Sequence, residues 1–357
     1  MRRHDDPSPP GADPGSGHAS PARPLPQYTL RDDEAEELRA LAKSLRDAED
    51  APGSPAFYDR HWTAVDQLPA GLRRFLETFR RTEPAAACLV HGFPTDEPPV
   101  GPTPGHWDAA GSDSAPNQEL YLALCGMALG EPFTWATLQL GRVIQNILPI
   151  PGDERRQNGY GSETLLEFHT EDGFHPERCD YLLLLGLRND DHVPTIVSSV
   201  RDVELGPRDR ALLTDRRFHI LPDDEHVRQL QARNPDHPAL GEMLRMRNDP
   251  EPVGVLFGDE TRPYLRIDRP FMRCVGADPA AESALDRLMA ELERVQRDVV
   301  VGPGTLLVVD NYLAVHGRRP FQVRYDGTDR WLKKLTVKRN LRRSAPDRGT
   351  GSHRVLV

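Results

Sequence analysis

The chain has 357 residues, about two average domain lengths, and its formal net charge at pH 7 is -10. This acidic balance argues against general nucleic-acid binding, which needs a basic face, and against attraction to anionic membranes. No run of about 18 apolar residues occurs, and the N-terminus lacks the apolar core of a signal peptide, so we expect no membrane span and no secretion. The 4 cysteines are scattered without a C-x-x-C pair, which favours a reduced, cytoplasmic compartment.

Composition separates two tails from one domain. Residues 1–27 are rich in Pro, Gly, Ser, Asp and Arg, so they cannot bury enough apolar surface to order themselves and we expect a disordered tail. Residues 28–343 are expected to form a single domain, and residues 344–357 a C-terminal tail. Within the domain, the charged segment 208–250 separates predicted strands. A long connection of this kind predicts a partly helical lid over a functional site.

The first part of the domain is predicted to be helical. Thr29 is a plausible helix cap, and apolar residues recur after it at helical spacing, at Leu38, Leu41, Ala42 and Leu45. Two further helices are predicted over residues 62–80 and 117–127. The Pro- and Gly-rich stretch 94–116 between them predicts a long loop.

Short strands dominate from about residue 134 onward. Residues 181–187 form a nearly continuous apolar run, as expected of a strand buried on both faces, and residues 195–200 are rich in β-branched side chains. Further strands are predicted at 137–148, 165–169, 253–257, 264–267, 305–309, 312–316 and 333–338. A single helix with an apolar stripe, around residues 285–295, interrupts them. This order predicts an α+β, mainly β fold: a double-stranded β-helix, or jelly roll, flanked by helices.

A histidine and a glutamate directly follow one of these strands, in the segment Phe168-His169-Thr170-Glu171. At the end of a strand, residues i and i+2 point to the same face, so one imidazole and one carboxylate could converge on a single ion. The pattern H-x-[DE] is weak alone, because it also begins at His4, His106 and His175. Of these pairs, the one at His169 directly follows an apolar strand. A surface turn is the alternative for this pair taken alone.

A second signal lies far downstream, where His316 ends a predicted strand. Two histidines and one carboxylate form the facial triad that holds non-haem iron(II) and leaves three positions open. Those positions suit a chelating co-substrate and one oxygen molecule. Fourteen residues after His316 stands Arg330, whose planar guanidinium suits the far carboxylate of 2-oxoglutarate. Taken alone, His316 could instead be a core histidine, and Arg330 could belong to a surface ion pair.

Three segments together resemble a known family. The sequences HTED, VDNYLAVHGRRPF and RYDGTDRWLK are similar to those of the clavaminate synthase-like, TauD-type oxygenases that use Fe(II) and 2-oxoglutarate. Within that family the chain looks most like the amino-acid β-hydroxylases, such as the viomycin-type arginine hydroxylase and the asparagine hydroxylase. The resemblance spans roughly residues 130–342. It implies a jelly roll with iron at one mouth, in a dioxygenase that consumes 2-oxoglutarate and O2 to hydroxylate the β-carbon of an amino acid in antibiotic or other specialised-metabolite biosynthesis.

The resemblance also implies roles for individual residues. His169, Glu171 and His316 match the iron ligands. Arg330 matches the arginine that pairs with the distal carboxylate of 2-oxoglutarate, and Thr195 sits where such enzymes place a hydroxyl for the same carboxylate. For the substrate, Gln139 is the implied contact of the amino group and Asp268 that of the side-chain end. Lys334 is the implied contact of the substrate carboxylate.

Two positions depart from the pattern of the arginine hydroxylases. These enzymes carry a second acid two residues after the first, where this chain has Pro270. Their arginine for the substrate carboxylate is replaced by Lys334, which can neutralise a carboxylate but lacks the bidentate geometry. Three alternatives to a free basic or polar amino acid such as arginine therefore stay open. They are an amino acid tethered to a carrier protein, a desaturation or ring closure, and a β-barrel binding protein without enzymatic activity.

Overall fold

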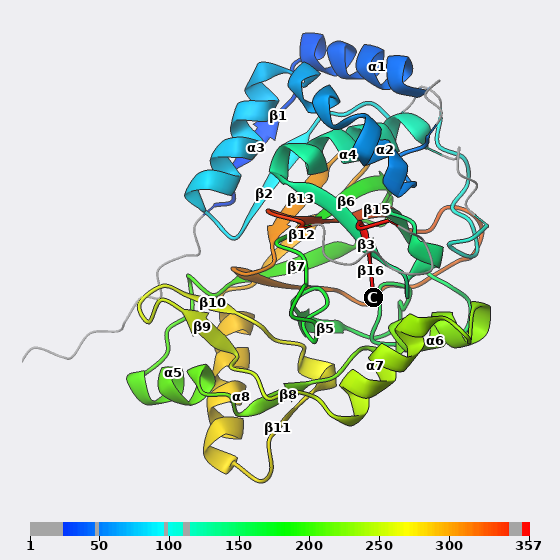
Figure 1. Ribbon diagram of the computed structural model, residues 1–357. Helices are drawn as coiled ribbons and strands as arrows, with labels where there is room; N and C mark the ends of the chain where they lie inside the picture. Colours follow the sequence, from blue (N-terminus) through cyan, green and yellow to red (C-terminus); the bar gives the residue numbers. More distant parts are fainter. Residues whose placement is uncertain (1–23, 47–49, 96–98, 110–114, 343–351) are drawn as a thin grey trace, which may run out of the picture.

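Two main sheets organise the chain in the computed structural model, which describes residues 24–46, 50–95, 99–109, 115–342 and 352–357 (Figure 1). One sheet has 8 strands and the other has 4, and two short two-stranded sheets lie beside them. Helices flank the sheets, so the fold is a mixed α/β architecture built on a large sheet. No helix within these described ranges is long and apolar enough to cross a membrane.

The larger sheet has the strand order β1-β2-β13-β6-β15-β3-β16, with β4 also paired to β15. Its strands are β1 (Gln27–Thr29), β2 (Ala87–His91), β3 (Glu131–Trp135), β4 (Ile144–Ile147), β6 (Tyr181–Arg188), β13 (Leu306–Asp310), β15 (Trp331–Lys338) and β16 (Val355–Leu356). The apolar strand β6 lies between β13 and β15 and is antiparallel to both. Its first seven residues are buried, which confirms the expectation of a strand covered on both faces.

The smaller sheet positions the histidines. Its order is β12-β7-β14-β5, formed by β5 (Leu166–His169), β7 (Pro194–Ser199), β12 (Arg297–Val300) and β14 (Ala314–Arg318). Strand β14 is antiparallel to both β5 and β7, and the register places His316 opposite His169. The two remaining sheets pair β8 (Phe218–Ile220) with β11 (Met272–Cys274) and β9 (Leu256–Gly258) with β10 (Pro263–Leu265).

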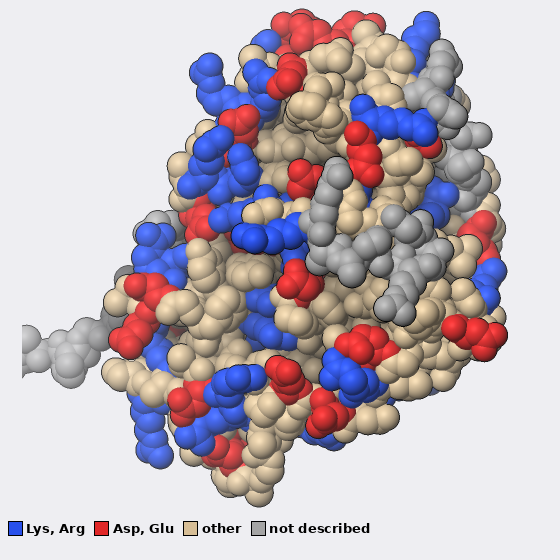
Figure 2. Space-filling view, viewed as in Figure 1, with Lys and Arg blue, Asp and Glu red and all other residues tan. Residues whose placement is uncertain are grey.

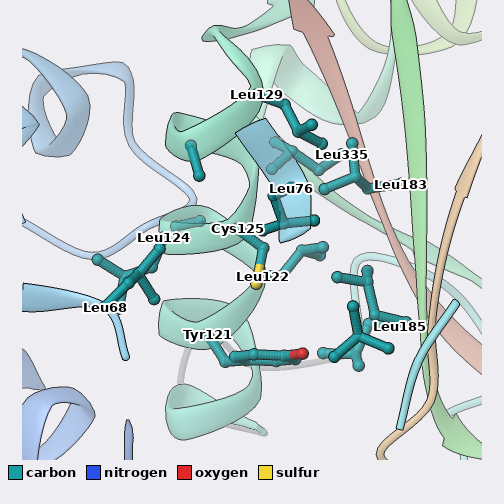
Figure 3. Packing of buried hydrophobic residues seen from close by; sticks show 14 of the residues in the cluster. Leu68, Leu76, Tyr121, Leu122, Leu124, Cys125, Leu129, Leu183, Leu185 and Leu335 are labelled. Carbon is teal, nitrogen blue, oxygen red and sulfur yellow. The ribbon is translucent and has the colours of Figure 1, made fainter. Parts of the chain in front are cut away.

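Helices cover the outer face of the larger sheet (Figure 1). They are α1 (Asp32–Arg46), α2 (Pro55–Arg60), α3 (Ala70–Thr82) and α4 (Pro116–Leu129). Helix α4 is buried nearly all round because it packs between the outer helices and the sheet. Figure 3 shows Leu122 and Cys125 of α4 facing Leu183 and Leu185 of β6.

The remaining helices lie beside the smaller sheet and its rim. Helix α8 (Pro279–Arg294) packs against α5 (Pro207–Thr214) and β7 over a second apolar core. Helices α6 (Asp224–Arg233) and α7 (Pro238–Asn248) fall within the predicted lid segment, which is partly helical as expected. Charged side chains of both signs are interspersed over the face shown in Figure 2, consistent with a protein of modest net negative charge.

Several predicted boundaries were wrong. The helix expected at 62–80 is divided at Pro69 into a short 3-10 helix, η1 (Trp62–Gln67), and α3, because proline lacks the amide proton that a continuous helix needs. The strand expected at 137–148 is a 3-10 helix, η2 (Gln139–Gly141), followed by β4. The third 3-10 helix is η3 (Arg269–Phe271).

The expected tails also need correction. Residues 1–23 and 343–351 lie outside the described residues. Gln27, assigned to the N-terminal tail, belongs to β1, which pairs in parallel with β2. Val355 and Leu356, assigned to the C-terminal tail, form β16 and pair with β3. Backbone hydrogen bonds to an existing sheet order these ends, although their composition predicts no core of their own.

A buried ion pair links α4 to β15. Lys333 Nζ lies 2.7 Å from Glu119 Oε1, and both side chains are 1% exposed. Burial lowers the pKa of Lys333, and the Glu119 carboxylate opposes that shift. Arg142 Nη2 lies 3.6 Å from the same oxygen, so it is a weaker second partner.

We predict that Lys333→Met lowers the free energy of unfolding by about 3 kcal/mol, because it leaves a buried carboxylate without its nearest cation. Urea denaturation measures the loss. The matched control, Lys333→Met combined with Glu119→Leu, should recover most of it. A single variant that is no less stable than the double variant would contradict this account.

Candidate active site

Three side chains converge where the smaller sheet ends. His169 ends β5, His316 lies in β14, and Glu171 follows in the turn after β5; their potential ligand atoms all lie within 4.8 Å of one another. The pairing of β5 with β14 brings the two imidazole rings to a centroid distance of 4.2 Å. His316 Nε2 lies 3.4 Å from Glu171 Oε2. The backbone register therefore gathers two histidines and one carboxylate around a single point.

The protonation states suit a divalent metal. Burial and the neighbouring His316 lower the pKa of His169 to about 4, so its ring is neutral at neutral pH. Its Nδ1 lies 2.9 Å from the Glu167 carbonyl oxygen, and a proton on Nδ1 leaves the Nε2 lone pair free for a metal. Burial would raise the pKa of Glu171, but Lys334 and the two histidines hold it well below its usual range. Two imidazoles and one carboxylate are the donor set that fits non-haem iron(II).

The turn that carries Glu171, residues 170–179, is called the metal turn below. Asn311, in the connection between β13 and β14, is fully buried and binds this turn at three points. Its Oδ1 accepts from the Glu171 amide at 2.7 Å, and its Nδ2 donates to the carbonyl oxygens of Glu171 and Cys179, each at 3.0 Å. Asn311 thus fixes the peptide of the carboxylate ligand from the connection that leads to His316.

Two further contacts hold the metal turn. Thr170 Oγ1 donates to the Ile267 carbonyl oxygen at 2.9 Å, and Arg266 donates to the carbonyl oxygens of Gly173 and Phe174. The segment that leads to Asp268 is thereby fixed against the metal turn. Sequence reasoning assigned no role to Asn311 or Arg266, although Asn311 lies in the VDN segment that carries the family resemblance.

Arg330 is a buried cation without an anionic partner. Its Nη2 donates to Thr195 Oγ1 at 3.0 Å, its Nε has no hydrogen-bond partner, and no carboxylate among the described residues pairs with it. Burial and the charge of Arg318 lower the pKa of Arg330 to about 9, so it stays charged at neutral pH. An unpaired buried charge is costly, which makes this position suited to an incoming carboxylate.

A second buried arginine, Arg318, reinforces the positive end of the site. It belongs to β14 and donates to the carbonyl oxygens of Gly161 and Thr164. Burial lowers its pKa to about 10. Sequence reasoning did not single out this residue, although it stands two positions after His316 in the quoted segment. A dianion such as 2-oxoglutarate would meet two guanidinium groups here.

One cavity of about 110 Å³ joins most of the predicted residues. Seven of the eight line it: His169, Glu171, Thr195, Asp268, His316, Arg330 and Lys334. Gln139 does not line the cavity. Its side-chain amide donates to the Asn146 carbonyl oxygen at 2.8 Å and to the Tyr160 hydroxyl at 2.9 Å, so it supports the cavity wall from behind.

Lys334 contacts the metal site directly. Its Nζ donates to Glu171 Oε1 at 2.7 Å, while Oε2 of the same carboxylate faces His316. Burial opposes the charge on Lys334, but Glu171 and Asp172 outweigh it and raise the pKa of the amine. One carboxylate oxygen is thereby bound by the lysine and the other is left for a metal.

Acidic side chains line another part of the cavity. Asp268 is buried, and burial together with the negative charge of Asp223 raises its pKa well above the usual range. Asp223 and Glu225 also line the cavity and come from the N-terminal end of α6. Sequence reasoning missed both, because nothing in the spacing of an Asp-Asp-Glu helix start relates it to residues far away in the chain. The available signal was the position of these acids within the predicted lid.

Comparisons with known proteins bear on the reaction class. Residues 139–336 match the family described as taurine catabolism dioxygenase TauD, TfdA. The chain belongs to this family. It is 38% identical over 338 residues to the enduracididine beta-hydroxylase of Streptomyces hygroscopicus, covering 92% of this chain and 98% of that protein. It is also 38% identical over 302 residues to the L-ornithine/L-arginine 3-hydroxylase of Catenulispora acidiphila, covering 82% and 88%.

Solved structures of the non-heme iron oxygenase OrfP are similar over nearly the whole length. A complex with Fe, succinate and (3S)-hydroxy-L-Arg matches with a TM-score of 0.85 at 37% identity, covering 93% of this chain and 100% of that chain. A complex with Fe and alpha-ketoglutaric acid matches with a TM-score of 0.81 at 38% identity and the same coverage. The predicted family is confirmed, and the chain is a 2-oxoglutarate-dependent dioxygenase that uses Fe(II) and O2.

The residue assignments remain predictions that the geometry supports. His169, Glu171 and His316 would hold the iron, and Arg330 with Thr195 would hold the distal carboxylate of 2-oxoglutarate. When bound, the iron supplies the activation of O2 that the oxidative decarboxylation of 2-oxoglutarate requires. The side chains of this chain supply position, charge balance and exclusion of water.

We predict that Arg330→Ala weakens 2-oxoglutarate binding at least 100-fold, because it removes the charge-assisted partner of a buried carboxylate. Anaerobic calorimetric titration of the iron-loaded enzyme measures the affinity. Arg324→Ala removes an arginine that pairs with Asp191 at the surface and should leave the affinity unchanged. Affinity within threefold of the unsubstituted enzyme in Arg330→Ala would refute the assignment.

We also predict that Asn311→Ala lowers iron(II) affinity by about 10- to 100-fold, because the peptide of Glu171 loses the side chain that fixes it. Competition against a chromogenic chelator measures the affinity. The exposed Asn340→Ala serves as the control and should bind iron normally. Unchanged iron affinity in Asn311→Ala would show that the turn needs no such restraint.

Proposed function

We propose that this enzyme hydroxylates the β-carbon of a free L-amino acid whose side chain ends in a cation, with a guanidine such as that of arginine as the first choice. The observation that carries the proposal is the acidic part of the cavity. Asp268 and Asp223 line it, and Asp268 has no cationic partner among the described residues. A cationic side-chain end would neutralise this unpaired acidic group.

Asp223 is also relevant to the acid that this chain lacks at position 270, where it has Pro270. The arginine hydroxylases that the chain resembles carry a second acid at that position, and its loss argued against a guanidinium. Asp223 and Asp268 line the same cavity, and the charge of Asp223 contributes to the raised pKa of Asp268. We infer that Asp223 takes the place of the missing acid.

Lys334 fits a free amino acid when its contact with Glu171 is taken into account. An ammonium has three donors, and one of them is used by Glu171. The others remain for a substrate carboxylate, which would then lie beside the metal and bring the β-carbon near it. The relatives support this choice, since one is named an L-ornithine/L-arginine 3-hydroxylase and an OrfP complex contains (3S)-hydroxy-L-Arg.

The proposal also covers the barrel topology, the domain bounds, the cellular compartment and the metabolic role of the product. We infer that the two main sheets form a double-stranded β-helix within one domain over residues 28–343, with the metal at one mouth and segment 208–250 as its lid. The pairing of β14 with β5 and β7 supports this arrangement. The four cysteines are free, which fits a reducing cytoplasm. Production of a hydroxylated amino acid for a specialised metabolite fits the named relatives.

A carrier-tethered substrate is the second candidate, because a thioester has no free carboxylate and would leave Lys334 entirely to Glu171. Both candidates are tested by supplying free amino acids and their carrier-bound thioesters and measuring succinate together with the mass of the product. We expect succinate and a product with one added oxygen from a free guanidino amino acid. Turnover with thioesters alone would refute the free substrate.

We predict that Asp268→Asn raises the KM for a cationic amino acid by about 30-fold or more, because the loss of a buried charge partner costs a few kcal/mol. The slow, substrate-independent conversion of 2-oxoglutarate to succinate should not change. Asp286→Asn, at an exposed carboxylate that lies near Arg269, is the matched control. An unchanged KM in Asp268→Asn would place the side chain of the substrate elsewhere.

A further inference from the structure

A buried polar chain connects helix α6 to the metal turn. His226 of α6 is completely buried, and its Nε2 donates to Asp172 Oδ1 at 3.1 Å. On its other side, Nδ1 lies 2.6 Å from Thr137 Oγ1. Asp172 Oδ2 accepts from Trp135 Nε1 at 2.6 Å. Four side chains from three segments thus form one continuous path, and Asp172, the residue that follows Glu171, lies within it.

The metal turn has an unusual backbone conformation at Asp172, one of the residues in this path. Asp172 has a φ of 52°, in the left-handed region that non-glycine residues seldom occupy. Such a conformation persists when surrounding contacts hold it. Both carboxylate oxygens of Asp172 are occupied, one by β3 through Trp135 and one by α6 through His226. The helix and the ligand turn therefore constrain each other.

The backbone of His226 also helps to form the start of α6. Asp223 caps the helix by accepting from the amides of Glu225 at 2.8 Å and His226 at 3.3 Å. The residue whose ring binds the metal turn therefore shares a cap with the residue that lines the cavity. Any shift of His226 would move Asp223 and Glu225 with it.

We propose that His226 is a positioning residue, whose buried contact with Asp172 fixes α6 to the metal turn and so sets the distance between the substrate-binding acids and the metal. The inference rests on the proposed function in one respect, namely that Asp223 faces the substrate. A target carbon must lie close to the reacting centre for efficient reaction, and small displacements reduce the rate strongly. The link makes the two ends of the cavity a single rigid unit.

The other contacts of α6 do not replace this link. Gln229 Oε1 accepts from the Gln139 amide at 2.7 Å, one turn further along the helix. Arg228 pairs with Asp153 from a half-exposed position. Neither of these polar contacts reaches the metal turn, although Val227 of α6 shares a buried apolar cluster with Phe174 of that turn. Apolar packing has little directionality, so loss of the His226 ring should leave the helix attached to the protein but remove its hydrogen bond to the residue that follows Glu171.

The test compares His226→Leu with His226→Gln, which retains an amide donor, and with Arg247→Ala, which removes a surface ion pair to Asp224 of the same helix. In His226→Leu we expect the KM for the amino acid to rise at least 10-fold, with more succinate formed per hydroxylated product. Anaerobic binding of iron(II) and 2-oxoglutarate should stay within twofold. His226→Gln should recover part of the loss, and Arg247→Ala should match the unsubstituted enzyme.

Hydrogen exchange of the iron- and 2-oxoglutarate-loaded enzyme gives a readout that needs no substrate, so it separates this inference from the substrate assignment. We expect faster exchange over residues 223–233 in His226→Leu and unchanged exchange in β5 and β14. If His226→Leu does not fold, Thr137→Val removes the other partner of the ring and should produce a smaller shift in the same direction. Unchanged exchange over α6, or equal losses of metal binding and substrate binding, would overturn the proposal.

Discussion

The antiparallel pairing of β14 with β5 is the constraint on which the site depends. It places His316 opposite His169 by backbone register alone, before any side chain is positioned. Asn311, in the connection that leads into β14, then binds both sides of the Glu171 peptide. One connection and one strand pair therefore bring the three predicted ligands together. A shift of one residue in this register would turn the histidines to opposite faces of the sheet.

Unbalanced charge within one cavity distinguishes this site from the structural ion pairs of the protein. Lys333 and Glu119 compensate each other in the core. In the cavity, by contrast, Arg330 has no carboxylate and Asp268 has no cation among the described residues. We propose that each is complementary to a group that arrives from solution, Arg330 to a carboxylate of 2-oxoglutarate and Asp268 to a cationic end of the substrate.

The sequence predicted the residues for iron and 2-oxoglutarate better than it predicted which other residues line the cavity. The ligands, Arg330 and Thr195 lie in short segments with a strong resemblance to one family, and the apolar runs of β6 and β13 identify their strands. Asp223, Arg318 and His226 were missed because their roles depend on which distant segments meet, and local patterns do not encode such meetings. Gln139 was expected in contact with substrate but is bound to Asn146 and Tyr160. The terminal strands β1 and β16 escaped notice because a sheet partner orders them.

The most direct test of the metal site is an anaerobic titration with iron(II) and 2-oxoglutarate, followed by visible absorption spectroscopy. A complex in which 2-oxoglutarate chelates iron held by His169, Glu171 and His316 should give a weak charge-transfer band that saturates at one iron per chain. The band should be absent in His316→Ala. No band in the unsubstituted enzyme, or an unchanged band in His316→Ala, would contradict the assignment of these three residues as the metal site.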